Sequence, residues 1–320
     1  MKKFLLKLLL CVLLICTSAI CFIGCSEDGA NGKDGISVEQ ESFSKGLVYQ
    51  ANSDRTGYVI TGIGTNTDKV LKIPETYNGL PVTGFAFYDM PYADTYIQKL
   101  ELPKNFMLHE EYDGKKVYNL EFLGYLEAVE EIVISEDNPY YKYVDGVVYS
   151  KDGKTLIFYA KNKQNASFTV PDGVETIEHV GYYSSNIYLE YLTLPSSLKE
   201  TGGATFACFT SLKEVVIPNG LESIANDTFS LCTSLTSITI PDSVTSIGYQ
   251  AFYYCTSLTS VTIGNGVTRI DSNAFQECTA LSSITFNGTV DEWNAIAKVL
   301  DWNSDVPATK IICSDGEVAI

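Results

Sequence analysis

Apolar residues recur at every twenty-third position in the C-terminal half of this 320-residue chain, and this period limits the folds open to it. One column consists of Phe206, Phe229, Phe252 and Phe275. Four more columns keep the same step: Leu212, Leu235, Leu258 and Leu281; Val215, Ile238, Val261 and Ile284; Ile217, Ile240, Ile263 and Phe286; Leu198, Leu221, Val244, Val267 and Val290. One unit alone has too little apolar surface to be stable, so the period predicts a repeat solenoid whose units share one core.

The unit itself predicts a β-rich coil. The segment Ile238–Ile240 alternates apolar and polar residues, which indicates a short strand with one buried face. Pro241 ends this strand because proline has no N–H for the ladder. Val244 and Ile247 then point back inside, and we expect Ala251-Phe252 to form an outer layer on a turn of helix. Each unit is thus predicted to contain one short parallel strand, turns and a short helical segment.

Three segments of this unit resemble the BspA-like leucine-rich repeats of bacterial surface proteins: the run 240–248, Ala251-Phe252 and the run 255–258. The resemblance implies a leucine-rich-repeat solenoid with N- and C-terminal caps. Residues 191–288 form its regular 23-residue repeats. Residues 46–190 follow the pattern more loosely and are interpreted as an N-terminal cap and diverged repeats with an insertion.

Residues 289–320 are interpreted as the C-terminal cap, which an open solenoid needs to cover its last strand edge. Thr289 and Glu292 fit a capping box at the start of a helix. The expected apolar face of this helix consists of Val290, Trp293, Ile296, Ala297 and Leu300. A last strand is expected around residues 310–313.

The first 45 residues do not look like part of the fold. Residues 1–24 begin with a charged segment followed by an apolar run, as in a signal peptide. The following Cys25, preceded by Gly24, resembles the lipidation site of a bacterial lipoprotein, although Phe22 departs from the usual leucine. Residues 25–45 are polar and rich in glycine, which is typical of a flexible tether. We therefore expect a secreted protein held by lipid at Cys25 and exposed on the cell surface.

The negative net charge of the chain limits the classes of partner that it can bind. The net charge of −17 is a poor match for nucleic acid, which requires basic surface. It also argues against docking on anionic lipid, so the lipid at Cys25 is the expected contact with the membrane. A surface of this charge repels neighbours of the same sign and favours solubility.

The cysteines and histidines do not indicate a catalytic or metal site. Cys208, Cys232, Cys255 and Cys278 follow the repeat, so buried free thiols are favoured, while disulfides between neighbouring coils remain an alternative. One cysteine per coil forms a line, whereas zinc requires a tetrahedral cluster. His109 and His179 have no second histidine nearby, and residues 135–138 favour a solvated loop over a calcium site. We expect no metal, no cofactor and no enzymatic activity.

The remaining candidate is a binding surface. Residues that alternate with the buried columns should form two rows on the face of the sheet, where repeat proteins commonly bind partners. The rows contain Tyr191, Thr193, Glu214, Val216, Ser237, Thr239, Ser260, Thr262, Ser283 and Thr285. The leading hypothesis is a non-catalytic adhesion module that binds protein or glycan on host or neighbouring cells. The alternative is a structural or assembly component of the bacterial cell envelope.

Overall fold

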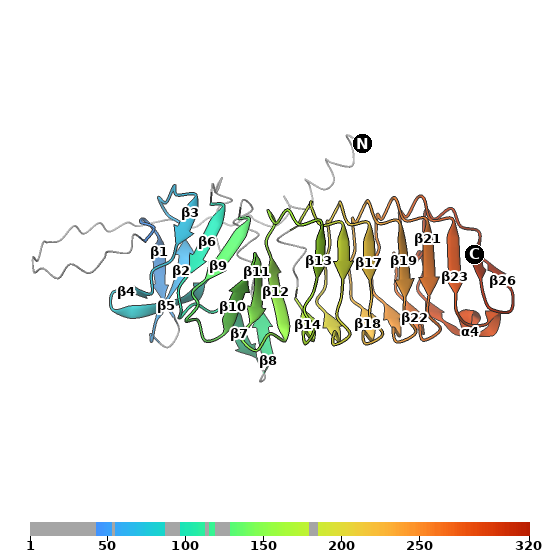
Figure 1. Cartoon of the computed structure of the whole chain (residues 1–320), viewed down its shortest axis with the longest axis horizontal. Coiled ribbons are helices and arrows are strands. Elements are labelled where there is room, and N and C mark those ends of the chain that lie inside the picture. Colours follow the sequence, from blue (N-terminus) through green and yellow to red (C-terminus); the bar gives the residue numbers. More distant parts are fainter. Residues whose placement is uncertain (1–42, 53–54, 87–96, 113–114, 119–128, 179–184) are drawn as a thin grey trace, which may run out of the picture. The chain divides into compact units, whose positions relative to one another are not determined.

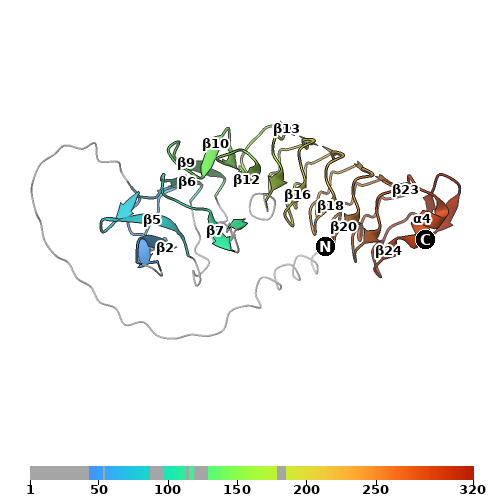
Figure 2. The same cartoon turned by 90° about the horizontal axis from the view of Figure 1, so that it is seen from below.

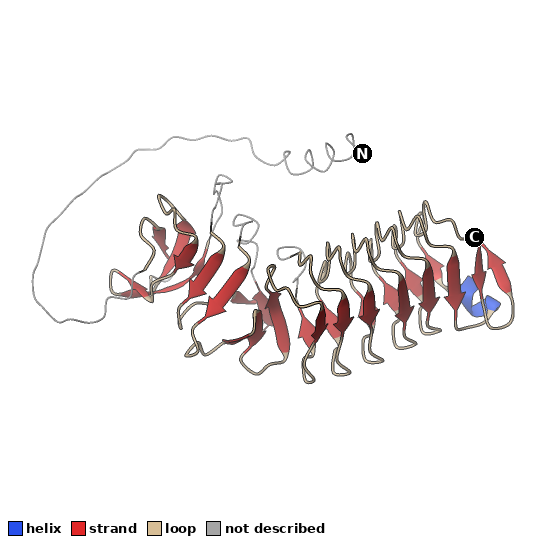
Figure 3. Ribbon diagram, turned by 45° about the horizontal axis from the view of Figure 1, so that its top comes forward, coloured by secondary structure: helices blue, strands red, loops and turns tan. Residues whose placement is uncertain are grey.

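The 23-residue period corresponds to one coil of a β-solenoid of about nine turns. The computed structural model describes residues 43–320 except for 53–54, 87–96, 113–114, 119–128 and 179–184. Figure 3 shows strands throughout the described part and one helix near its C-terminal end. Residues 1–24, Cys25 and most of the expected tether therefore lie outside the described residues.

Each coil of the regular array contains two strands, so the expectation of one strand per unit is wrong. In the coil 236–258 they are β19 (Ser237–Ile240) and β20 (Ser246–Ile247). Ile247 is fully buried and pairs in register with Ile224 and Ile270 of the neighbouring coils. Two residues suffice for the second strand because its hydrogen-bond partners come from adjacent coils. The sequence pattern within one unit does not reveal these partners.

The longer strands form the first side of the array and are parallel (Figure 1). They are β13 (Ser167–Thr169), β15 (Tyr191–Thr193) and β17 (Glu214–Val216), followed by β19, β21 (Ser260–Ile263), β23 (Ser283–Phe286) and β25 (Lys310–Ile312). The strand β26 (Glu317–Ala319) pairs antiparallel with β25. Ile238, Val261 and Ile284 lie opposite one another in the ladder, so each apolar column of the sequence becomes a continuous row of buried side chains.

The short strands form the second side. They are β14 (Thr176–Ile177) and β16 (Glu200–Thr201) in one sheet, and β18 (Ser223–Ile224), β20, β22 (Arg269–Ile270) and β24 (Ala297–Lys298) in another. Figure 2 shows this side from below. On the first side, strand pairing is interrupted between β17 and β19. On the second side it is interrupted one coil earlier, between β16 and β18.

The third side of each coil consists of turns, so the expected helical turn at Ala251-Phe252 is wrong. Gln250 and Tyr254 adopt left-handed backbone conformations, with φ of 52° and 58°. This geometry breaks a helix and turns alternate N–H groups toward the next coil. Phe252 N–H donates to Ala274 C=O at 2.8 Å, and Phe229 N–H donates to Ala251 C=O at the same distance.

Stacked phenylalanine rings fill the core beneath these turns. The ring centroids of Phe229 and Phe252 lie 5.5 Å apart and those of Phe252 and Phe275 lie 5.1 Å apart. The planes differ by 14° and 7°, so neighbouring rings are nearly parallel. The aromatic column read from the sequence is therefore confirmed as one buried stack.

The N-terminal part uses shorter and more varied sheets. One contains β1 (Val48–Ala51), β2 (Tyr58–Gly62), β5 (Leu80–Phe85) and β4 (Thr76–Tyr77); a second contains β3 (Val70–Lys72), β6 (Lys99–Leu102) and β9 (Glu131–Ile134). The strands β7 (His109–Tyr112) and β8 (Lys115–Tyr118) form a hairpin. The strands of the second sheet are parallel, so this part of the chain, like the regular array, contains a parallel ladder.

A three-stranded segment separates two apolar cores. It contains β10 (Tyr141–Val144), β11 (Val147–Ser150) and β12 (Thr155–Tyr159). Val147 and Leu156 pack into the core of the regular array, whereas the next residues, Val148 and Ile157, pack into the N-terminal core. Because successive strand residues point to opposite faces, these strands bury both faces and divide the interior.

The expected C-terminal helix is shorter than its sequence pattern suggests. The helix α4 (Val290–Ala295) begins with the predicted capping box of Thr289 and Glu292. It ends at Ala295, so the expected apolar face through Leu300 is wrong, and Leu300 is 84% exposed. Trp293 instead packs edge-on against Trp302, with ring centroids 5.9 Å apart. The two tryptophans thus contact each other although only Trp293 belongs to α4. The role of this segment as a cap stays a prediction.

Candidate binding surface

The ten sequence-predicted face residues lie in two rows on the first side of the array. The strand registers place Tyr191 opposite Glu214, and Thr193 opposite Val216. Three later coils repeat the arrangement with serine in one row and threonine in the other: Ser237, Ser260 and Ser283, and Thr239, Thr262 and Thr285. The predicted rows are therefore present, although no contact in the structure tests their role in binding.

Exposure differs along these rows. The row residues of β15, β17 and β19 are exposed, whereas Ser260, Thr262, Ser283 and Thr285 are half-buried. Tyr191 and Val216 are large hydrophobic residues on this face and are 44% and 48% exposed. The most accessible part of the face is therefore the part contributed by residues 191–239.

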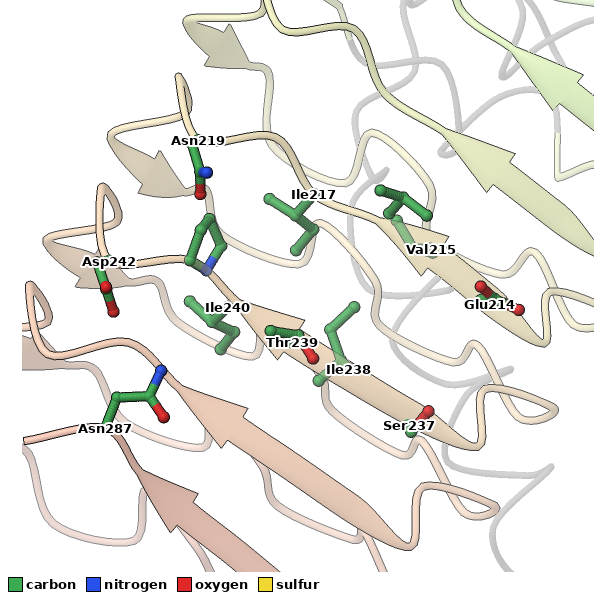
Figure 4. Close-up of a pocket in the computed structure, with 12 residues that line it drawn as sticks. Glu214, Val215, Ile217, Asn219, Ser237, Ile238, Thr239, Ile240, Asp242 and Asn287 are labelled. Atoms are coloured by element: carbon green, nitrogen blue, oxygen red, sulfur yellow. The ribbon is translucent and has the colours of Figure 1, made fainter. Parts of the chain in front are cut away.

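A groove of about 490 Å³ lies on this face, where the first sheet is interrupted between β17 and β19 (Figure 4). Its lining includes Glu214, Val216, Asn219, Ser237, Thr239 and Asp242. Buried apolar residues of both strands form its floor, among them Val215 and Ile240. Known ligand sites have volumes of about 300–1,000 Å³, so the groove is large enough for part of a ligand.

The chemistry of the groove is polar and acidic around an apolar floor. Hydroxyl groups come from Ser237 and Thr239, and carboxylates come from Glu214 and Asp242. Asp242 Oδ1 accepts a hydrogen bond from Asn265 N–H at 3.0 Å. In the described part of the chain, no ion pair involves Glu214 or Asp242, and no cationic side chain lines the groove.

Sequence reasoning found the rows but missed the groove. A signal was present, because the coil containing β17 has Glu214 and Val216 where the next three coils have serine and threonine. Asn219 and Asp242 follow the two strands that border the groove and also went unremarked as lining residues. Periodicity identifies which residues share a face, but it does not show where a hydrogen-bond ladder is interrupted.

The four cysteines that follow the repeat are free thiols, of which Cys208 is half-buried and the other three are buried. Cys232, Cys255 and Cys278 are fully buried free thiols. Each Sγ donates to the C=O of a phenylalanine in the preceding coil, with distances of 3.3, 3.2 and 3.1 Å. Burial raises the pKa of Cys232 and of Cys255. A thiol with a raised pKa is a poor nucleophile, so this column functions as apolar packing.

Other sequence candidates are dispersed. His109 lies in the strand β7, whereas His179 lies outside the described residues. In the acidic run 135–138, Asn138 is fully buried and its Oδ1 accepts from Tyr140 N–H and Tyr141 N–H at 2.9 and 3.1 Å. Asn138 therefore stabilises a loop. Across the residues that can be described, no three histidine, cysteine, aspartate or glutamate side chains come together as metal ligands would.

The coil architecture and its periodic columns define a leucine-rich-repeat protein. Residues 202–297 match the family described as "BspA type Leucine rich repeat region (6 copies)", so this part of the chain consists of repeats of that type. No curated protein matches the sequence. Proteins of this family and fold are typically non-enzymatic.

Solved structures with a similar fold come from several bacteria. A leucine-rich repeat protein from Eubacterium ventriosum is 18% identical, with 78% of this chain and 69% of that chain covered and a TM-score of 0.53. The pneumococcal vaccine antigen PcpA is also 18% identical, with 77% and 67% covered and a TM-score of 0.50. A leucine-rich cell surface protein from Faecalibacterium prausnitzii is 19% identical, with 80% and 97% covered and a TM-score of 0.49. The likeness to the first two shows the fold.

The described helix α4 has six residues, and no helix in the described ranges is long and apolar enough to cross a membrane.

Proposed function

We propose that this chain is a cell-surface adhesion module, anchored by lipid at Cys25, that binds protein partners without catalysing a reaction. The observation that carries the proposal is the pair of outward-facing rows on the first side of a leucine-rich-repeat array, which are in register from β15 to β17 and from β19 to β23. Hydroxyl groups, a tyrosine and an exposed valine on one face supply hydrogen bonds and apolar contact, the combination that protein interfaces use.

The cell-surface location is supported by the BspA-type repeats of residues 202–297, since homologues with such repeats are cell-surface proteins. The lipid anchor is supported by the sequence around Cys25, which lies outside the described residues. Acyl chains at that position would hold the array at a membrane, since two or more chains anchor a protein stably.

The test is a cell-adhesion assay with three variants. Cells that display the chain are applied to immobilised extracellular-matrix proteins and to neighbouring bacterial cells. Thr262→Arg places a large cation on the binding face and is expected to reduce adhesion at least about fivefold, since unfavourable charge and bulk at an interface cost about 1 kcal/mol or more. The matched control is Thr268→Arg, because Thr268 is an exposed threonine of the same coil on the second side.

The third variant, Cys25→Ser, is expected to release the protein from the membrane fraction without altering its fold. Equal adhesion by the Thr262→Arg and Thr268→Arg variants would rule out the proposed face. Retention of the Cys25→Ser variant in the detergent phase would rule out the proposed anchor.

A further inference from the structure

The groove between β17 and β19 marks a break in backbone pairing as well as a hollow in the surface. In the next steps of the sheet, Gly264 N–H donates to Ile240 C=O at 2.8 Å and Asn287 N–H donates to Ile263 C=O at 2.9 Å. Pro241 occupies the corresponding position beside Ile217 and has no N–H to donate. The strands β17 and β19 consequently remain adjacent without a recorded register, and their facing edges border the groove.

A proline alone does not cause this break. Pro218 follows β17 in the same way, yet β15 and β17 stay paired because Leu194 N–H donates to Val216 C=O at 3.2 Å. The equivalent bond from Ile217 to Thr239 is not recorded among the described residues. The β17–β19 step thus lacks both kinds of bond that hold the C-terminal ends of neighbouring strands together, whereas just before the two strands Thr236 N–H still donates to Lys213 C=O at 3.3 Å.

The two carboxylates of the groove lie at opposite ends of it. Glu214 begins β17, and Asp242 follows the end of β19, five positions beyond the ladder equivalent of Glu214 (Figure 4). The chain rises about 3.3 Å per residue from Ser237 to Ile240 and then turns at Asp242, so the two backbone positions are at most about 16 Å apart along the groove. Between them lie Val216, Ser237 and Thr239, which offer one apolar and two hydroxyl side chains.

This arrangement favours an extended cationic chain as the occupant. Lysine or arginine residues four positions apart in an extended peptide are about 13 Å apart, and their long side chains bridge the remaining distance to both carboxylates. The groove has no aromatic ring on which a sugar could stack. The chain as a whole carries a net charge of −17, which attracts basic partners and raises their association rate.

We infer that the groove between β17 and β19 binds an extended segment of a partner protein through two basic side chains spaced four residues apart, one at Glu214 and one at Asp242. The inference deepens the proposed function by naming the partner's chemistry, and it rests on the proposal that the array binds protein. The peptide lies along the groove on the face of the sheet, with its central residues above Val216 and Thr239.

The test measures binding of an end-capped fluorescent peptide whose two lysines flank threonine, valine and threonine. Fluorescence anisotropy is recorded with the whole chain, with the groove variant Glu214→Gln/Asp242→Asn, and with the control variant Glu200→Gln/Glu222→Gln. The two control glutamates are exposed and lie on the second side, so the control removes the same charge away from the groove. Asparagine at position 242 keeps an oxygen that can accept from Asn265 N–H.

The groove variant is expected to bind the peptide about tenfold more weakly, because it removes both carboxylates that would pair with the peptide's lysines. The control variant is expected to bind within about twofold of the unsubstituted chain, because distant exposed charges are screened by salt. A peptide with glutamine in place of both lysines, and one with adjacent lysines, are expected to bind more weakly.

The inference is overturned if the whole chain does not bind the peptide, if the groove and control variants weaken binding equally, or if the glutamine peptide binds as well as the lysine peptide. A linear oligosaccharide that competes fully for the groove would overturn it in favour of a glycan ligand. These outcomes are separate from the adhesion assay, in which Thr262→Arg tests the face two strands away from β17.

Discussion

The regular array and the N-terminal part of this protein reach a buried core by different means. In the array, each coil adds the same side chains to the same columns, such as the stacked rings of Phe229, Phe252 and Phe275. In the N-terminal part, the sheets are short and irregular, and buried polar groups hold the loops between them. Tyr141 Oη, for example, accepts from Leu108 N–H at 2.9 Å inside that core. The array is thus stabilised by repeated apolar contacts, whereas the N-terminal part depends on particular hydrogen bonds to its loops.

Two buried asparagines show how the second strategy operates. Asn186 Nδ2 donates to the C=O groups of Ala160, Lys161 and Lys163, at 3.0, 3.2 and 2.8 Å. Its Oδ1 accepts from Tyr188 N–H and Leu189 N–H at 2.8 and 2.9 Å. Asn138 uses its side chain in the same way one segment earlier. One side chain thus satisfies several backbone groups that no ladder reaches.

The largest effect is expected in the regular array. Phe252→Ala removes a fully buried ring from the middle of the stack and is expected to lower the free energy of unfolding by about 3–5 kcal/mol. Hydrogen exchange should show faster opening in β19, β21 and β23 than in β2, β6 and β9, because the ring packs into the core of the array alone. Urea unfolding gives the magnitude. Equal acceleration in both regions would contradict the division into two cores.

A somewhat smaller effect is expected where the two regions meet. Asn186→Ala leaves buried N–H and C=O groups without partners and is expected to cost about 2–3 kcal/mol. Hydrogen exchange should accelerate at residues 160–163 and 188–189 first. Asn265→Ala is the matched control, since Asn265 is exposed and its side chain forms no hydrogen bond with any residue that the structure describes, and it should change stability by less than about 0.5 kcal/mol. If Asn186→Ala lowered the free energy of unfolding no more than this control, the side chain of Asn186 would not be what stabilises the loop.

The smallest effect concerns an exposed ion-pair network at the same junction. Lys154 Nζ and Lys199 Nζ lie 2.8 and 2.7 Å from the carboxylate of Glu175. Hydrogen bonds from these lysines lower the pKa of Glu175 from 4.5 to about 2. Because the folded pKa is depressed, the stabilisation is fully present above pH 4.5 and is lost as the pH falls through about 2.

The Glu175→Gln variant should therefore lose less stability than the unsubstituted chain between pH 5 and pH 2, as followed by urea unfolding at each pH. Glu200→Gln is a control on the neighbouring coil, because no ion pair of Glu200 is recorded among the described residues. Identical pH profiles for the unsubstituted chain and the Glu175→Gln variant would show that the network is fully screened by solvent.

Much of the array follows from the sequence because its signal is repeated. An apolar column such as Leu235, Leu258 and Leu281 has one efficient arrangement, with each side chain above the last in a shared core. The alternation at Ile238–Ile240 likewise determines which residues face outward, and so the sequence predicts the two rows on the first side of the array. The capping box of Thr289 and Glu292 was also predicted from the sequence, because it depends only on residues of the same turn.

The contacts between coils were decided only by the tertiary structure. The second strand of each coil, the left-handed turns at Gln250 and Tyr254, and the groove between β17 and β19 all depend on which backbone groups a neighbouring coil supplies. The strands β11 and β12 bury both faces for the same reason, since one core lies on each side of them. A period in the sequence determines which side chains stack, because burial acts on each residue type directly. Hydrogen bonds between coils depend on distances of a few tenths of an ångström, and only the packed structure determines those.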